Sequence, residues 1–281
     1  MKLGELFKFC KVELQKHNIT SYQIDSLILI SHTLKISKEE VIFNSDLLLS
    51  NSQRKEIKSL LKRRILGEPI SHIIGKRAFF EDEFLVNKNV LDPRPDSEIL
   101  IETILEIFLS NQQKLKILEL GVGSGCLILT ILKKLKDAFG VGVDISKTAL
   151  KVVKENAKNL KLVPKLTLIN SNWFEKLEEW DFDLIISNPP YIKTDAINNL
   201  QKEVKLFEPK LALDGGKDGL DCYRIIAKDV DKFLKKSGYL FLEIGQNQED
   251  DVIKIFGDKL KFIKLKKDLS GIIRCLVFQK L

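Results

Sequence analysis

The residues best suited to chemistry are the four at 188–191, with the sequence Asn-Pro-Pro-Tyr. They follow Asp183–Ile186, an apolar run that predicts a short strand. Proline fixes its own φ and pushes the residue before it towards extended geometry, so we expect Asn188 to be held at the strand's end. Neither proline has an N–H, so the segment presents acceptors, and Tyr191 adds a flat aromatic wall. The pattern predicts a clamp for a planar NH2 group, with a plain proline turn as the alternative.

A glycine-rich loop, Gly121-Val122-Gly123-Ser124-Gly125, lies between a predicted strand and a predicted helix. Glycines permit a tight turn and close approach of the backbone to a ligand, and the start of a helix supplies free N–H groups. The spacing does not match the dinucleotide pattern Gly-x-Gly-x-x-Gly, and no lysine follows the glycines as in a phosphate-binding P-loop. The loop therefore predicts a binding turn without provision for a pyrophosphate, with a purely structural turn as the alternative.

Asp144 and Trp173 follow two later strands of the same predicted sheet. An acid about 20 residues past a glycine loop is placed to accept hydrogen bonds from ribose hydroxyls. Helix capping is the alternative role for Asp144, although Ser146 already suits it. Trp173 is placed to pack against an adenine face, with a core aromatic as the alternative. These residues predict a nucleoside pocket beside an amino-group clamp. No nucleophile–base pair is evident nearby, so the combination favours transfer of a preactivated group to nitrogen.

Strand and helix patterns alternate regularly after Lys114, which predicts an α/β fold with a parallel sheet covered by helices on both faces. The predicted strands are Leu115–Leu120, Phe139–Val143, Leu166–Ile169, Phe182–Ile186, Tyr239–Ile244, Lys261–Leu265 and Ile272–Phe278, and the last two should pair antiparallel because no helix separates them. The predicted helices are Ile99–Leu109, capped by Asp96 or Ser97, then Cys126–Leu135, a helix from Ser146 to Asn159, Asp218–Lys236 ended by Gly238, and Gln248–Phe256. Ligands of such sheets bind beyond the carboxyl ends of the strands, where the loop, Asp144 and Asn188 are expected to meet.

The first 75 residues have helical rather than alternating patterns. We predict helices over residues 3–17, from a cap at Ser21 to about Leu34, and from a cap at Asn51 or Ser52 to a stop at Gly67. We therefore expect a helical domain at 1–75, a hairpin linker at 76–92 and a catalytic domain at 93–281.

Composition is that of a globular protein: 281 residues, 44 % hydrophobic and 30 % charged, with a formal charge of +7. Residues 1–75 hold 12 Lys and Arg against 8 Asp and Glu, which mildly favours an acidic or nucleic-acid-associated partner, or reflects solvated lysine-rich helix faces. The four cysteines form no C-x-x-C pair and the three histidines are scattered, so we expect no metal site and reduced thiols. No apolar run approaches membrane-spanning length, and we expect a cytoplasmic protein with no membrane partner.

The glycine loop, Asp144 and Asn188-Pro189-Pro190-Tyr191 together resemble a class I S-adenosylmethionine-dependent methyltransferase that acts on a planar NH2 group. Further stretches narrow the resemblance to the PrmC (HemK) family of peptide-chain release factor glutamine methyltransferases. These stretches are Arg63–Pro69, Pro93–Glu98, Glu208-Pro209 with Gly215–Leu220, and Leu242–Gly245 with Gln248. The similarity covers nearly the whole chain and is weakest before Leu60 and after Gln248.

The resemblance implies a Rossmann-like seven-stranded sheet with an antiparallel end, and an N-terminal helical domain that helps to dock the release factor. It implies that S-adenosylmethionine is held by Gly121, Val122, Gly123, Ser124, Gly125, Asp144, Trp173 and Asn188. It implies that the substrate glutamine is held by Asn188, Pro189, Pro190 and Tyr191. This sequence has Glu119 where the family often has Asp, Asn172 where Asp is common before Trp, and Asp92 in place of an apolar residue. For Arg94 and Glu98, a structural role and a place beside the site are both open.

Two other functions fit parts of the pattern. An N6-adenine methyltransferase uses the same clamp on a flipped base, but this chain lacks a large recognition domain or a dense basic stripe. A non-catalytic S-adenosylmethionine-binding module would not need the complete Asn-Pro-Pro-Tyr segment. We therefore predict a methyltransferase whose partner is a release factor, with no direct nucleic-acid binding.

Overall fold

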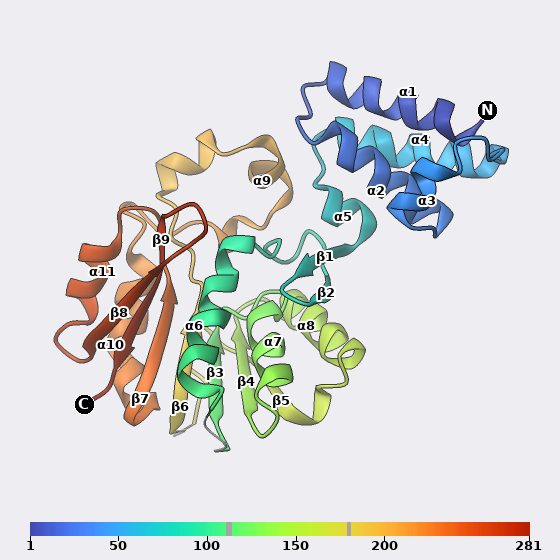
Figure 1. The fold of residues 1–281 in the computed structure, drawn as a ribbon. Coiled ribbons are helices and arrows are strands. Elements are labelled where there is room, and N and C mark those ends of the chain that lie inside the picture. The colour runs from blue at the N-terminus through green and yellow to red at the C-terminus, as the bar shows by residue number, and fades with distance from the viewer. Residues whose placement is uncertain (111–113, 179–180) are drawn as a thin grey trace. The chain divides into compact units, whose positions relative to one another are not determined.

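The computed structural model describes residues 1–110, 114–178 and 181–281, which group into two compact units (Figure 1). The first unit comprises residues 1–76 and 201–207, and the second comprises residues 77–200 and 208–281. No helix in the described part of the chain is both long and apolar enough to cross a membrane.

The first unit is helical. Its helices are α1 (Leu3–Lys16), α2 (Tyr22–Leu34), α3 (Lys38–Phe43), α4 (Asn51–Ile65), α5 (Ile70–Ile74) and α9 (Lys202–Phe207). The predicted helices are confirmed as α1, α2 and α4, whereas α3, α5 and α9 are too short to give a clear periodic pattern. The predicted cap of α4 was wrong, because Ser50 caps it by accepting a hydrogen bond from the Gln53 N–H at 3.2 Å. Leu6, Ile30 and Ile57 are fully buried among these helices.

A buried arginine explains why residues 201–207 belong to this unit. Arg64 on α4 donates to the Asp25 carboxylate at 2.6 Å and forms an ion pair with Glu203 of α9 at 2.7 Å. Only 4 % of the Arg64 side chain is exposed. A buried guanidinium without carboxylate partners is costly, so these two acids hold α9 against the helical unit.

The second unit contains a seven-stranded sheet in the order β5-β4-β3-β6-β7-β9-β8. Its strands are β3 (Lys116–Leu120), β4 (Phe139–Asp144), β5 (Leu166–Asn170), β6 (Phe182–Ser187), β7 (Leu234–Glu243), β8 (Lys261–Lys267) and β9 (Ile273–Gln279). The first five of these pair in parallel, while β9 pairs antiparallel with both β7 and β8. The predicted sheet and its antiparallel end are confirmed. The short strands β1 (Lys76–Phe79) and β2 (Asp82–Leu85) form a separate two-stranded sheet.

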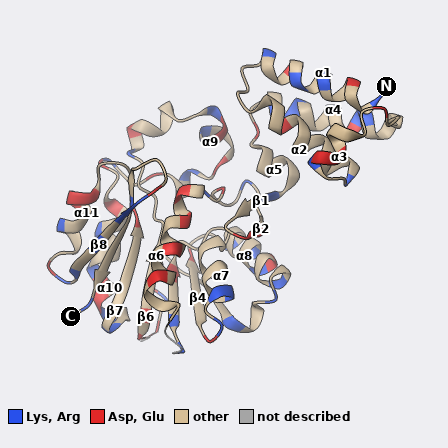
Figure 2. Ribbon diagram, viewed as in Figure 1, with Lys and Arg blue, Asp and Glu red and all other residues tan. Residues whose placement is uncertain are grey.

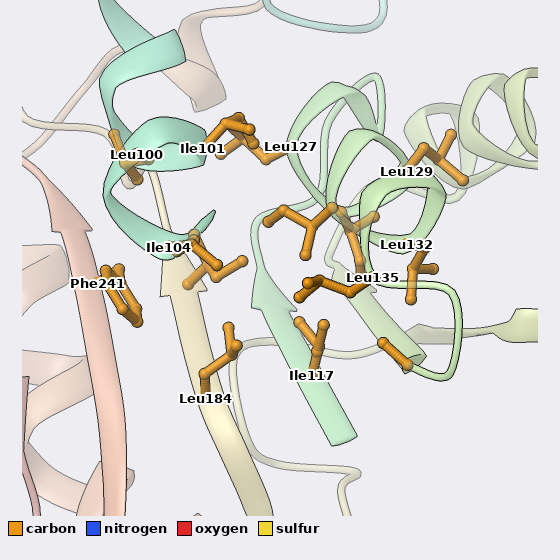
Figure 3. Close-up of a cluster of buried hydrophobic side chains, with 14 of the residues drawn as sticks. Leu100, Ile101, Ile104, Ile117, Leu127, Leu129, Leu132, Leu135, Leu184 and Phe241 are labelled. Atoms are coloured by element: carbon orange, nitrogen blue, oxygen red, sulfur yellow. The ribbon is translucent and has the colours of Figure 1, made fainter. Parts of the chain in front are cut away.

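Helices cover both faces of the large sheet (Figure 1). They are α6 (Glu98–Phe108), α7 (Cys126–Lys134) and α8 (Lys147–Asn159) on one face, and α10 (Asp221–Phe233) and α11 (Glu249–Phe256) on the other. Figure 3 shows Leu100 and Ile104 of α6 beside Leu184 of β6 and Phe241 of β7, all buried. Each fully buried side chain of this kind stabilises the fold by about 1.5–3 kcal/mol, which holds the strand ends at fixed positions.

Helix α10 is shorter than predicted. It begins at Asp221 rather than Asp218 and ends at Phe233, where β7 follows directly. Leu234 pairs with Phe182 at the start of β6, so the chain is already part of the sheet where the pattern predicted helix. Gly238 therefore lies inside β7 and does not stop a helix.

Candidate active site

A pocket in the second unit lies at the carboxyl ends of β3, β4, β5 and β6, where ligands of parallel sheets bind. Its lining includes these predicted site residues: Gly121, Val122, Gly123, Ser124, Asp144, Trp173, Asn188 and Pro190. The other three predicted residues, Gly125, Pro189 and Tyr191, are described in the structure but lie outside the pocket lining. Among the described residues, no group of three or more His, Cys, Asp or Glu side chains is placed to hold a metal ion.

Glycines at the two ends of the glycine loop have different purposes. Gly121 has φ +73°, and a Cβ atom there would meet nothing described within 4 Å, so its backbone is open to a ligand. Gly125 has φ +79° and begins α7, where a Cβ atom would lie 2.8 Å from the Val153 side chain of α8. Gly125 is therefore required for the backbone turn and for close packing of α7 against α8.

Asp144 ends β4 and braces the glycine loop. Its carboxylate accepts hydrogen bonds from the Gly123 N–H at 2.9 Å and the Ser146 N–H at 2.8 Å. Burial raises the pKa of Asp144, and these two backbone bonds oppose the shift. The predicted cap is confirmed at Ser146, whose hydroxyl accepts from the Ala149 N–H at 3.1 Å. Asp144 is thus held in one orientation at the pocket wall.

Of the two residues considered after β5, Trp173 lines the pocket as well as packing against the core, and the side chain of Asn172 binds a neighbouring side chain. Trp173 lines the pocket at φ +48° and also packs against the buried cluster on the α10 side of the sheet. Asn172 donates from its side chain to the Glu175 carboxylate at 2.6 Å. Trp173 therefore lies partly in the pocket wall and partly against the core, and its packing against an adenine stays a prediction.

The Asn-Pro-Pro-Tyr segment follows the end of β6, as predicted. Asn188 Nδ2 donates to the Ser97 hydroxyl at 3.2 Å, which leaves the Oδ1 atom for another partner. The Tyr191 hydroxyl donates to Glu243 Oε1 at 3.3 Å, and its backbone carbonyl accepts from Gln248 Nε2 at 3.1 Å. The two polar residues of the segment are therefore held by side chains from three distant elements.

Ser97 and Glu243 are two residues whose contacts in this site were not predicted, although both lie in stretches that carry the family resemblance. Ser97 was expected as a possible helix cap, and it occupies the N-cap position of α6 without a side-chain cap hydrogen bond from a described residue. Glu243 ends β7 after an apolar run, and a lone acid at the carboxyl end of a buried strand was the signal available for it. Burial raises the pKa of Glu243 to about 7, with Ser97, Arg274 and Tyr191 opposing the shift.

The structure separates the roles of Arg94 and Glu98. Arg94 lines the pocket and donates to both oxygens of Glu208 at 2.7 Å. Glu98 instead accepts from the Phe80 N–H at 2.8 Å, so its contact is structural. Burial raises the pKa of the Glu208 carboxyl group, its Arg94 partner opposes the shift, and the nearby buried Asp92 adds to it.

Glu119 carries out a structural task below the loop. It is buried in β3 and accepts a hydrogen bond from the Ile128 N–H of α7 at 2.9 Å. Burial raises the pKa of Glu119 well above its ordinary value. Its carboxyl group thus links β3 to the first turn of α7, on either side of the glycine loop.

Comparisons with known proteins identify the family of this chain. Residues 5–75 match the family model "PrmC N-terminal domain", and residues 89–208 match "Methyltransferase small domain". The chain is 39 % identical to the release factor glutamine methyltransferase of Caulobacter vibrioides, over 96 % of this chain and 93 % of that one. It is 37 % identical to the enzyme of the same name from Agrobacterium fabrum, over 95 % and 93 %. The chain belongs to the release factor glutamine methyltransferase family.

Other relatives of this family member differ in length or share only its fold. The chain is 38 % identical to a bifunctional methyltransferase of Rickettsia felis but spans only 56 % of that protein's length. A methyltransferase of Pyrococcus furiosus has the same fold, with a TM-score of 0.52 at 17 % identity, over 79 % of this chain and 98 % of that one. A 16S rRNA methyltransferase of T. thermophilus, solved with AdoMet and guanosine, has a TM-score of 0.52 at 20 % identity, over 73 % and 50 %. These structures show the class I methyltransferase fold.

Proposed function

We propose that this chain uses S-adenosylmethionine to methylate the side-chain amide nitrogen of the glutamine in the Gly-Gly-Gln motif of peptide-chain release factors. Family membership supports this substrate class. The observation that carries the proposal is the hydrogen bonding of Asn188, a pocket-lining residue whose NH2 group donates to Ser97, so that its Oδ1 atom is left as an acceptor.

The pocket residues fit the proposed cofactor. The open backbone at Gly121 and the loop N–H groups suit close approach of a ligand, and the fixed Asp144 carboxylate suits ribose hydroxyls. Trp173 offers an aromatic surface for the adenine. When bound, S-adenosylmethionine supplies an activated methyl group. The chain's own residues would bind the nucleoside and leave the Asn188 edge of the pocket for the acceptor nitrogen.

The clamp addresses the central difficulty of the reaction. An amide nitrogen is a poor nucleophile because its lone pair is delocalised. Asn188 Oδ1 and the Pro189 carbonyl would accept its two N–H groups, which aims the nitrogen and stabilises the positive charge that develops on it. A strong general base is unnecessary, since an N-alkylated amide cation is acidic enough to lose its proton to water.

Residues 1–75 are proposed to dock the release factor. The match of residues 5–75 to the PrmC N-terminal domain supports a family-specific task for this segment. Basic and acidic residues both occur on the helices of the first unit (Figure 2). Charges of both signs suit a protein partner better than the single-sign surface that nucleic acid favours.

The test is to offer the purified protein labelled S-adenosylmethionine together with release factor, DNA or rRNA in parallel. We expect label on the release factor, located by mass spectrometry at the Gly-Gly-Gln glutamine. A release factor carrying Ala in place of that glutamine is the matched control and should stay unlabelled. Label on adenine in either nucleic acid would favour the adenine methyltransferase and contradict the proposal.

A further inference from the structure

Two side chains from other elements form hydrogen bonds to the clamp residues Asn188 and Tyr191. Asn188 Nδ2 donates to Ser97 Oγ at 3.2 Å, and the Tyr191 hydroxyl donates to Glu243 Oε1 at 3.3 Å. Ser97 is 3 % exposed and Glu243 is 1 % exposed. Hydrogen bonds shielded from water in this way fix geometry more firmly than exposed ones.

Ser97 has a hydroxyl that its helix does not use. It occupies the N-cap position of α6, yet its side chain accepts no hydrogen bond from the described N–H groups of that helix. Serine is favoured at this position because its hydroxyl normally caps, so the hydroxyl is diverted to another partner. That partner is the Asn188 carboxamide.

Glu243 has an oxygen that lacks a partner. Its Oε2 atom is buried and accepts no hydrogen bond from any residue that the structure describes. The Ser97 hydroxyl is close enough to this carboxylate to lower its pKa. An unpaired buried carboxylate oxygen costs free energy, so donation from the neighbouring Ser97 hydroxyl would stabilise it.

The chemistry of the three groups fixes the direction of the bonds. An ionised carboxylate can only accept hydrogen bonds, so a Ser97 hydroxyl turned towards Glu243 would be the donor. Its hydroxyl has one proton, so towards Asn188 it can only accept, and the group it accepts from must be the NH2. The Asn188 Oδ1 atom is then directed away from Ser97. With Ser97 donating to ionised Glu243, the charge on Glu243 would decide which end of the Asn188 amide is left for the substrate.

We propose that Ser97 and Glu243 are positioning residues that set the orientation of the Asn188 carboxamide and anchor the Tyr191 ring. The inference rests on the proposed function, because it concerns how the clamp receives an amide NH2. Protonated Glu243 would instead donate to Ser97, which could then donate to Asn188 and reverse the carboxamide. Methyl transfer should therefore require ionised Glu243.

The groups around Glu243 set the pH at which its carboxyl group ionises. Burial raises its pKa to about 7, the Ser97 and Tyr191 hydroxyls and Arg274 lower it, and Asp96 raises it further. Two thiols also face it, Cys126 on α7 and Cys275 on β9, and burial raises the pKa of both, so they stay neutral. Tyr223 of α10 donates to the Glu243 backbone carbonyl at 2.9 Å, and its own pKa is raised well above 10. The carboxyl group of Glu243 is thus the one in this set that changes charge near neutral pH.

The first experiment is a double-mutant cycle measured by single-turnover methyl transfer at saturating cofactor. Ser97→Ala should lower the rate about tenfold or more in the wild-type background, the loss expected for a hydrogen bond in a charged network. In the Asn188→Ala background the same change should alter the rate by less than about twofold, because its target is gone. Thr103→Val removes another buried α6 hydroxyl, one that donates to the Ile99 carbonyl, and should leave the rate near wild type. Equal losses from Ser97→Ala in both backgrounds would overturn the proposal.

A pH profile tests the role of charge. The wild-type rate should rise with pH through about 7, whereas Glu243→Gln keeps the side chain's shape but cannot ionise. A Gln amide can both donate and accept, so it does not fix the direction of the Ser97 bond. We expect this variant to be about tenfold slower at pH 8 and to lose the rise. An unchanged profile in the variant would overturn the role of Glu243.

A spectroscopic measurement keeps the inference independent of the substrate. In 15N-labelled wild-type protein, the Asn188 side-chain NH2 signals, assigned by their absence in Asn188→Asp, should be protected from exchange with solvent. Ser97→Ala should remove that protection while Thr103→Val keeps it. If the signals behave so but the release factor is not methylated, the proposed function fails and the positioning network stands. If the signals are equally protected in Ser97→Ala, the network is wrong whatever the substrate.

Discussion

Asn188 performs two tasks with one carboxamide. Its NH2 donates to Ser97, and its Oδ1 atom is the acceptor proposed for the substrate. The prolines after it cannot substitute for that oxygen, since they contribute backbone carbonyls alone. At the scale of single residues, the proposed chemistry therefore depends on which atom of this amide faces the pocket.

Asn188→Ala should lower the turnover rate on the order of a hundredfold or more, which corresponds to about 2.7–4 kcal/mol, by analogy with the loss of one oxyanion-hole donor. Cofactor affinity should change less, because most predicted cofactor contacts lie elsewhere. Asn188→Asp keeps acceptor oxygens and should retain more activity than Asn188→Ala. The comparison is made by single-turnover transfer to release factor, and a near wild-type rate for Asn188→Ala would refute the clamp.

Asp144→Ala should weaken S-adenosylmethionine binding by about 1–3 kcal/mol, the usual loss for hydrogen bonds to a charged group. The change removes the proposed ribose contact and also the brace on the Gly123 N–H. Isothermal calorimetry gives the affinity directly. The exposed Asp258, on the turn after α11, provides the control Asp258→Ala, which should bind as wild type does. Equal affinity of Asp144→Ala and wild type would mean that the pocket is misassigned.

At the scale of elements, the glycine loop is held by a buried asparagine on α8. Asn156 Nδ2 donates to the Ser124 carbonyl at 2.8 Å and to the Leu85 carbonyl at 3.1 Å. Its Oδ1 atom accepts from the Leu85 N–H at 2.7 Å. One side chain thus joins the loop, β2 and α8, and the helix pattern alone gives no sign of it.

Asn156→Ala should destabilise the protein by about 2–4 kcal/mol, because it removes these bonds and leaves buried backbone groups unpaired. Urea unfolding followed by circular dichroism measures the free energy of unfolding. Asn159 is an exposed asparagine at the end of the same helix, and Asn159→Ala should change the stability by less than about 0.5 kcal/mol. Similar effects for the two substitutions would show that the bonds of Asn156 contribute little.

At the scale of the whole molecule, buried acids make stability depend on pH. Glu243 has a folded pKa of about 7 against an ordinary value of 4.5, so the folded state holds its proton more tightly than the unfolded state. The stabilisation from the bound proton is complete below pH 4.5 and is lost as pH rises through about 7.

Between pH 4.5 and pH 8, ionisation of Glu243 should lower the free energy of unfolding of the wild type by up to about 3 kcal/mol. Glu243→Gln should not show this loss. The measured quantity is the difference between their free energies of unfolding in urea at pH 5 and at pH 8. Glu102→Gln, at an exposed position on α6, should follow the wild type at both values. A constant difference between wild type and Glu243→Gln would show that Glu243 has no such shift.

The proposed docking role of residues 1–75 has a candidate surface in the first unit. Phe43 and Leu48 are 82 % and 74 % exposed, and Ile42 and Leu47, their neighbours in the sequence, are exposed as well. We name these four side chains the apolar patch. Exposed apolar side chains that lie together commonly mark protein-binding surfaces.

Phe43→Ser with Leu48→Ser should raise KM for intact release factor by about fivefold or more and leave kcat within about twofold. Transfer to a short Gly-Gly-Gln peptide should not change, because such a peptide needs the clamp alone. Leu269, fully exposed on the loop between β8 and β9 in the second unit, provides the control Leu269→Ser. An unchanged KM for the double variant would exclude this patch as the docking surface.

The sequence by itself determined the order of strands and helices and the local conformation of the glycine loop and the Asn-Pro-Pro-Tyr segment. Alternating apolar runs predicted the strands and helices because burial on one or both faces imposes a period on the chain. Glycines and prolines marked the loop and the clamp, since backbone conformation at such residues is set locally. The sequence did not predict short helices such as α9. It also placed the end of α10 too late, because pairing of the chain with β6 overrides the local helical pattern there.

Tertiary structure alone decided which side chains support that site. Ser97 and Glu243 are 146 positions apart in the numbering, and only the fold brings α6 and β7 together behind Asn188. The same holds for Asn156 with Leu85 and for Arg94 with Glu208. Hydrogen bonds between residues far apart in the chain leave no period in a sequence, because each requires one polar atom at one place. The local sequence therefore predicts the Asn-Pro-Pro-Tyr segment, whereas the residues proposed to orient Asn188 come together only in the completed fold.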